Sequence, residues 1–241
     1  EDGLGEYITR IAVHPDSSVW LGTRSSGVFH YNNGEFINYS QGDGLLGGKV
    51  SSLTIDKMGN VWIGTSNGVS LIDGGAISTF PLGWVDTIGM GPDGTILISV
   101  ANYHDDEPPS EVYRFSGNSM EPFDIDADSV RVIKIVGDPN DGFWFCTDKW
   151  LGHMTDDGWD YYKGNSNLYQ NRITALEAAS DGSVWFGTGA ISRFINDEWE
   201  IYPSGDGQRN GYVSCIHEDK SGRIWFGELL CSYFDGTWET Y

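Results

Sequence analysis

The stretch that decides the fold is DKMGNVWIGTSNGVSLID, residues 56–73. It opens with an Asp-x-x-Gly turn signal and continues as a short apolar run, Val61 to Thr65, rich in residues that favour β-structure. Asn67-Gly68 is a second turn signal, and residues 69–72 form a second apolar run. The stretch therefore predicts a turn, a strand, a turn and a strand in succession.

The chain repeats this stretch along its whole length. Aligned on the Trp of the first predicted strand, the copies are centred on Trp20, Trp62, Leu97, Trp144, Trp185 and Trp225, which are 35 to 47 residues apart. A period of about 40 to 45 residues with four strands per unit is typical of a β-propeller blade, and no unit has the helical periodicity of a solenoid. The sequence therefore predicts an all-β fold, a six-bladed β-propeller with four antiparallel strands in each blade.

We expect residues 1–241 to form one propeller domain, monomeric as a domain, because six units of about 40 residues use the whole chain. The predicted blades span roughly residues 7–40, 49–81, 84–124, 129–163, 172–203 and 212–241. The chain shows no signal peptide and no apolar run of transmembrane length, and its first residues resemble the linker at residues 42–45. Either a leader has been removed or the chain is a piece of a longer array.

The formal net charge is −21, with 35 acidic and 14 basic residues. Such a field repels nucleic acid and anionic membranes, so we expect neither nucleic-acid binding nor membrane insertion. The charge is compatible with a secreted or periplasmic protein or with cation binding, although solubility alone accounts for it.

The repeated motif also resembles that of a known family. Asp-x-x-Gly-x-[Val/Ile]-Trp-[Ile/Phe]-Gly-Thr followed by Gly-Val is similar to the two-component regulator propeller repeat, found in periplasmic sensor domains of bacterial hybrid two-component systems. The resemblance covers essentially the whole chain and departs at Leu97, which replaces Trp, and at Glu228, which replaces Thr. It implies a ligand-binding, bacterial propeller that is periplasmic or extracellular. A looser resemblance to streptogramin-lyase-like propellers implies a lyase or hydrolase instead.

Loop lengths predict which face of the propeller binds a ligand. The connections between first and second strands, and between third and fourth strands, are short and nearly constant, whereas the other two kinds vary strongly. Variable loops on a rigid scaffold are where binding residues usually lie. Aromatic and basic side chains gather in these loops, as suits a carbohydrate or another small polar ligand. The predicted ligand-binding residues are Tyr7, Arg24, Lys49, Trp84, Tyr103, His104, Trp150, Arg172 and Tyr212.

Catalytic and metal signals are weak, and we expect a binding protein rather than an enzyme. No two histidines have metal-ligand spacing, and no nucleophile elbow, phosphate loop or dinucleotide motif occurs. We therefore name no catalytic residue, no metal ligand and no cofactor. His104 lies beside Asp105, Asp106 and Glu107, which keeps open a divalent cation and a lyase or hydrolase reaction. A protein-interaction scaffold with a protein partner is the third alternative.

The remaining aromatic residues and the cysteines have structural interpretations. The Trp residues that recur in the second strands occupy one slot per blade, and Trp159, Trp199 and Trp238 occupy another, so we interpret both sets as packing residues. The three cysteines, Cys146, Cys215 and Cys231, are too few and too far apart for a disulfide framework, and we expect three buried thiols.

Overall fold

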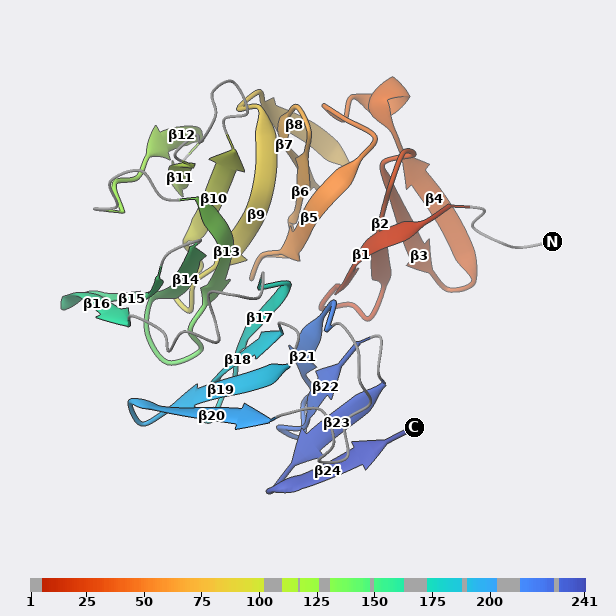
Figure 1. The fold of residues 1–241 in the computed structure, drawn as a ribbon. Coiled ribbons are helices and arrows are strands. Elements are labelled where there is room, and N and C mark those ends of the chain that lie inside the picture. Colours follow the sequence, from red (N-terminus) through yellow and green to blue (C-terminus); the bar gives the residue numbers. More distant parts are fainter. Residues whose placement is uncertain are drawn as a thin grey trace. The chain divides into compact units, whose positions relative to one another are not determined.

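In the computed structural model the chain is all-β, a six-bladed β-propeller whose blades are antiparallel sheets of four consecutive strands, as predicted (Figure 1). The structure describes residues 6–101, 110–116, 118–125, 131–147, 150–162, 173–187, 190–202, 213–227 and 230–241. The chain divides into two compact units, Glu1–Met90 with Gly94–Arg131 and Gly91–Asp93 with Val132–Tyr241.

The first unit contains blades one to three. Blade one consists of β1 (Ile8–Val13), β2 (Val19–Thr23), β3 (Val28–Asn32) and β4 (Glu35–Tyr39). A short 3-10 helix, η1 (Gln41–Asp43), leads to blade two, which consists of β5 (Val50–Ile55), β6 (Val61–Thr65), β7 (Gly68–Asp73) and β8 (Ala76–Phe80). Blade three consists of β9 (Trp84–Met90), β10 (Ile96–Ala101), β11 (Glu111–Ser116) and β12 (Ser119–Pro122).

The second unit contains blades four to six. Blade four consists of β13 (Val132–Gly137), β14 (Phe143–Thr147), β15 (Leu151–Thr155) and β16 (Gly158–Tyr162). Blade five consists of β17 (Ala175–Ala178), β18 (Val184–Gly187), β19 (Ile191–Ile195) and β20 (Glu198–Tyr202). Blade six consists of β21 (Ile216–Glu218), β22 (Ile224–Phe226), β23 (Cys231–Phe234) and β24 (Thr237–Thr240).

Within each unit the core lies between neighbouring blades. Trp20 packs with Val50 and Leu53 of the next blade, and Trp62 packs with Val85 and Ile88. Trp144 and Trp185 are buried in the same way in the second unit, whereas Trp225 is only half-buried. The predicted packing role is therefore confirmed for four of the five tryptophans. Burying the indole of one blade against the next blade stabilises both blades.

The glycine of the Trp-x-Gly-Thr motif is required by the same packing. A methyl group on Gly22 would lie 2.6 Å from Val50 Cγ1 of the next blade, and one on Gly64 would lie 2.6 Å from Val85 Cγ1. Gly187 stands in the equivalent relation to Val213, at 2.8 Å. Only glycine lets the first strand of the next blade approach this closely.

Hydroxyl groups at β-bulges join neighbouring blades. The pairing of β1 with β2 shifts register at Thr9, and the pairing of β5 with β6 shifts at Ser51. Thr9 Oγ1 donates to the carbonyl of Val50 at 2.9 Å, and Ser51 Oγ donates to the carbonyl of Val85 at 2.5 Å. A bulge re-aims one side chain, and here it points each hydroxyl at the next blade.

Candidate ligand-binding face

The antiparallel order puts the β2–β3 and β4–β5 connections at the same end of the first unit's sheets. This is the end at which the sequence predicts binding residues. Tyr7 precedes β1, Arg24 begins the β2–β3 turn, Lys49 precedes β5, and Trp84 opens β9. The first three side chains are exposed and Trp84 is half-buried.

Backbone contacts connect three of these predicted positions. The amide of Arg24 donates to the carbonyl of Tyr7 at 3.0 Å, which fixes the turn against the start of blade one. The amide of Gly27, at the end of that turn, donates to the carbonyl of Gly48 at 2.9 Å. Gly48 also lies against the carbonyl of Ser25 so closely that a methyl group there would collide with it. The residue before Lys49 is thus held against the turn that carries Arg24.

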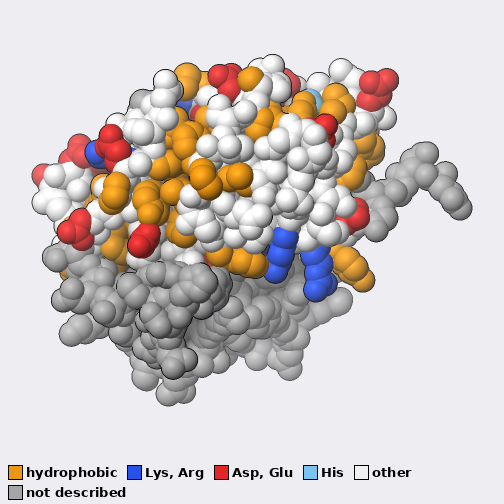
Figure 2. All heavy atoms as spheres, turned by 90° about the horizontal axis from the view of Figure 1, so that it is seen from above, with side chains coloured by type: hydrophobic (Ala, Val, Ile, Leu, Met, Phe, Trp, Pro, Cys, Tyr) orange, Lys and Arg blue, Asp and Glu red, His pale blue; other side chains and the backbone are white. Residues whose placement is uncertain are grey.

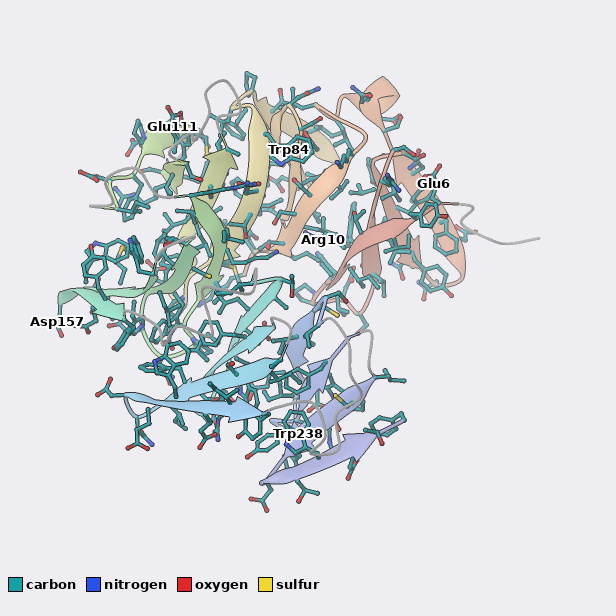
Figure 3. All side chains as sticks on the ribbon, in the orientation of Figure 1. Glu6, Arg10, Trp84, Glu111, Asp157 and Trp238 are labelled. Atoms are coloured by element: carbon teal, nitrogen blue, oxygen red, sulfur yellow. The ribbon has the colours of Figure 1, made fainter. Side chains whose placement is uncertain are left out.

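The fourth position joins through its side chain. Lys49 Nζ lies over the Trp84 ring, 4.5 Å from its centroid. This distance is within the range of a cation–π interaction, which at an exposed site contributes about 0.5–1 kcal/mol. The contact links the entries of blades two and three, and Figure 3 shows Trp84 at the start of β9. Tyr7, Arg24, Lys49 and Trp84 therefore belong to one continuous series of contacts, here called the mouth.

Glu6 holds the β2–β3 turn of the mouth through two side-chain hydrogen bonds. Its carboxylate accepts hydrogen bonds from Ser25 Oγ at 2.9 Å and from Ser26 Oγ at 2.7 Å. The hydrogen bonds from Ser26 and Ser25 lower the pKa of Glu6, so this carboxyl is ionised at neutral pH. The turn is thus tied down at both its backbone and its side chains, although the sequence offered no signal for this contact.

The remaining predicted residues divide into two groups. Trp150 precedes β15 in the second unit, and its ring packs at right angles to Trp159, 6.3 Å away, and to Tyr161, 5.2 Å away. Both partners lie on β16, the last strand of the blade, so the ring is directed toward its own blade's outer strand. Four predicted residues lie outside the described residues: Tyr103, His104, Arg172 and Tyr212.

One residue near the mouth escaped sequence analysis. Arg131 immediately precedes β13, and its guanidinium forms an ion pair with Asp86 of β9, with 3.4 Å between Nη2 and Oδ1. Several predicted binding residues, such as Lys49, directly precede a strand, but the strand predicted after residue 129 started at Val130, whereas β13 starts at Val132. A strand start displaced by two residues hid the arginine.

Among the described residues, no cluster of three or more His, Cys, Asp or Glu side chains could hold a metal ion. No helix in this part of the chain is long and apolar enough to cross a membrane. On the face shown in Figure 2, acidic side chains are dispersed and hydrophobic side chains reach the surface between polar ones.

The cysteines require one correction. Cys146 and Cys231 are buried free thiols, as expected, but Cys215 is exposed. The expected burial assumed a first strand of blade six that begins at Val213 and includes Cys215, whereas β21 begins at Ile216. A residue just before the strand is not covered by the sheet, which explains its exposure.

The two-component regulator propeller repeat is confirmed by comparison with protein families. The family described as "Two component regulator propeller" matches residues 44–67 and 207–227. The first match contains the Trp62 motif, and the second contains the Trp225 motif. The comparison with curated proteins found no match.

Solved structures of several propellers are similar to this chain. A catalytically inactive variant of virginiamycin B lyase from Staphylococcus aureus, solved with quinupristin, has a TM-score of 0.81 at 18% identity, with 100% of this chain and 86% of that chain covered. A streptogramin B lyase has a TM-score of 0.77 at 18% identity, with coverage of 98% and 82%.

An extracellular domain assigned to a hybrid two component system of B. thetaiotaomicron has a TM-score of 0.58 at 14% identity. That match covers 93% of this chain and 37% of the other. At these identities the likeness establishes the fold, and the function must be argued from the site.

Proposed function

We propose that this chain is an extracytoplasmic, sensor-type propeller that binds a carbohydrate or another small polar ligand at the mouth. The observation that carries the proposal is the series of contacts from Tyr7 to Trp84, which joins the backbone at Tyr7 and Arg24 to the entry of blade two and sets the Lys49 ammonium on the Trp84 ring. Aromatic rings with a few fixed polar groups are the usual lining of small-ligand sites. The regulator-propeller repeat and the likeness to an extracellular sensor domain support the location outside the cytoplasm.

Replacing Trp84 with Ala tests the site. We expect this variant to lose the thermal shift that the wild-type protein gives with its saccharide ligand in a screen of mono- and oligosaccharides, since a ligand of the native state raises Tm by mass action. The matched control is Tyr31→Ala. It removes an exposed aromatic ring from β3 of blade one, next to the β3–β4 turn at the end of the sheet away from the mouth. Equal ligand shifts in both variants and the wild type would remove the mouth as the site.

A lyase or hydrolase is the second candidate, and its support is the likeness of fold to virginiamycin B lyase over the whole chain. Incubation with quinupristin, followed by mass spectrometry of the intact compound, tests it. Consumption of quinupristin that a chelator abolishes would favour the lyase, with His104 and its acidic neighbours as the first residues to replace. Unchanged quinupristin would favour the binding function.

A further inference from the structure

The two cations of the mouth, Arg24 and Lys49, have no carboxylate partner among the described residues, unlike three arginines elsewhere in the chain. Arg131 pairs with Asp86, Arg193 pairs with Asp181 and Glu200, and Arg223 pairs with Glu239. Neither mouth cation forms an ion pair within the described part of the chain. Acidic residues outnumber basic ones by 35 to 14, so potential partners are abundant.

The carboxylates of the surrounding loops are already engaged. Glu6 uses both of its oxygens to accept from Ser25 and Ser26, although it lies against the turn that carries Arg24. Asp43, in the connection that leads to Lys49, accepts from the amide of Ser40 at 2.9 Å and from its hydroxyl at 2.8 Å. Both carboxylates are therefore turned toward local hydroxyls and amides, and not toward the two cations.

The Trp84 ring orients one of the cations without neutralising it. Lys49 Nζ lies 4.5 Å from the ring centroid, and an aromatic face attracts an ammonium group while leaving its charge available to another partner. A long exposed lysine is normally free to move, so an ammonium oriented by an aromatic ring, at the same end of the sheets as a second unpaired cation, is an arrangement suited to an anion.

We propose that the ligand of the mouth carries an anionic group, in the simplest case the carboxylate of an acidic saccharide, which Arg24 and Lys49 contact while Trp84 packs against the sugar ring. The inference rests on the proposed function and adds the chemical class of the ligand. It also gives a reason for the two unpaired cations, since a carboxylate of the protein would compete with the ligand for them.

Unpaired cations at a protein surface can also serve solubility alone. Lys220 is such a residue: it is exposed, lies in the β21–β22 turn at the opposite end of a sheet, and forms no ion pair with any residue that the structure describes. Lys220→Gln is therefore the matched control, because it removes the same charge from the protein without touching the mouth.

The experiment compares acidic and neutral sugars of the same shape. Binding of glucuronate and glucose, of galacturonate and galactose, and of their oligomers is measured by calorimetry for the wild type, Arg24→Gln, Lys49→Gln, Lys49→Arg and Lys220→Gln. We expect the acidic member of a pair to bind at least about tenfold more tightly, the value of one charge-assisted hydrogen bond. Each Gln variant at the mouth should lose that preference, Lys49→Arg should keep most of it, and Lys220→Gln should match the wild type.

The outcomes separate the two proposals. Equal affinity for the acidic and neutral members, lowered by Trp84→Ala but not by Arg24→Gln, would overturn the anionic ligand and leave the binding function standing. A preference for acids that Lys220→Gln lowers as much as Lys49→Gln would also overturn it, since net charge alone would then be responsible. Failure of the wild type to bind any sugar of the set would overturn the saccharide function and the inference together.

Discussion

Blades four and five each bury a tryptophan at the same position of the repeat, but they supply different hydrogen-bond acceptors to its indole N–H. In blade four, the carboxylate of Asp138 accepts directly from Trp144 Nε1 at 2.8 Å. In blade five, the hydroxyl of Ser183 accepts from Trp185 Nε1 at 2.9 Å and in turn donates to Asp181 at 2.5 Å. A buried N–H without an acceptor costs about 1–3 kcal/mol, which favours an acceptor in both of these blades, but the repeat does not dictate which one.

The difference follows from the position of Asp in the turn between the first two strands. In blades two, four and six the Asp lies six residues before the Trp and bonds to the indole itself: Asp56, Asp138 and Asp219. In blades one and five it lies four residues before, at Asp16 and Asp181, and a serine stands between the Asp and the Trp. The two arrangements give the same local fold with different chemistry under the indole.

The residue opposite the indole differs too. His153 is paired with Trp144 across the sheet and stacks on it, with 4.1 Å between ring centroids, and its Nε2 lies 3.1 Å from Asp138 Oδ2. Arg193 occupies the equivalent place in blade five, 5.2 Å from the Trp185 ring. In blade four the indole, the imidazole and the backbone of the turn therefore all contact the carboxylate of Asp138. We expect substitution of this carboxylate to lower stability more than substitution of the acceptor in blade five.

The largest effect is expected for Asp138→Ala. The substitution leaves the indole of Trp144 without its acceptor, removes one of the two acceptors near His153 Nε2 and frees the amide of Asn140, which donates to Asp138 at 2.8 Å. Loss of such a buried network costs about 3 kcal/mol in the free energy of unfolding. Urea unfolding followed by tryptophan fluorescence measures the loss.

Asp157→Ala is the control for that variant, because Asp157 is an exposed carboxylate in the β15–β16 turn of the same blade (Figure 3). It should change the free energy of unfolding by less than about 0.5 kcal/mol. A loss in Asp138→Ala no larger than in Asp157→Ala would show that the carboxylate does not organise blade four.

The second effect is a pH dependence confined to blade four. Burial opposes ionisation of Asp138, but hydrogen bonds from His153, Asn140 and Trp144 outweigh it and hold the pKa of Asp138 at about 2. Burial likewise acts to lower the pKa of His153, but its hydrogen bonds to Asp138 and Asp141 raise that pKa above its ordinary value.

The signs of these shifts define a window. The Asp138 contribution is present above the unfolded carboxyl pKa of about 3.8 and is lost as pH falls toward 2, whereas the His153 contribution is present below about 6.5 and is lost as pH rises through the raised pKa. The stability difference between the wild type and Asp138→Asn should therefore be greatest between about pH 4 and 6.5. A difference that does not vary with pH would mean that the pair does not ionise as described.

A smaller effect is expected for Ser183→Ala in blade five. The substitution removes only the relay, so the indole of Trp185 loses its acceptor while Asp181 keeps its ion pair with Arg193 at 2.7 Å. We expect a loss of about 1–2 kcal/mol in the free energy of unfolding. Ser221→Ala is the matched control, because Ser221 donates to Asp219 in blade six while Trp225 bonds to Asp219 directly. Equal losses in the two variants would contradict the relay.

The smallest effect is a gain of stability in blade one. The buried indole N–H of Trp20 has no hydrogen-bond partner in the described structure, and His14 occupies the place of the direct Asp. Replacing His14 with Asp, together with Asp16→Asn to avoid two carboxylates in one turn, should raise the free energy of unfolding by about 0.5 kcal/mol. The new hydrogen bond is partly offset by the lost contact between His14 Nε2 and the Gly59 carbonyl, now 3.0 Å long. Asp16→Asn alone is the control, and a further loss on adding His14→Asp would show that the indole needs no acceptor.

Sequence analysis found almost every strand, because each is bounded by its own turn signal. It missed β12, which carries Ser119–Pro122 and lacks an aromatic residue in the expected slot. The strand starts predicted at residues 130, 173 and 213 also precede the observed starts of β13, β17 and β21 by two or three residues. At these places apolar residues continue past the sheet, and only the pairing of strands shows where the ladder starts.

The site was less predictable than the fold for a physical reason. Loop positions could be assigned to one end of the blades, since strand direction in a repeat is fixed. The contact of Lys49 with Trp84 could not be predicted, because 35 residues separate them and no periodicity governs loop side chains. Trp150 was predicted at the same kind of loop position, but its ring packs on the outer strand of its own blade and, among the described residues, makes no contact of the Lys49–Trp84 kind.

By itself the sequence determined the number of blades, the strands of every blade except β12 of blade three, and the slots of the buried tryptophans. These features follow from turn chemistry and from alternation along a strand, which act over a few residues and are repeated. Only the tertiary structure decided why the motif needs its glycine, which acceptor each indole uses and which cations stay unpaired. Those properties depend on atoms from neighbouring blades or distant loops, which meet only when the sheets pack.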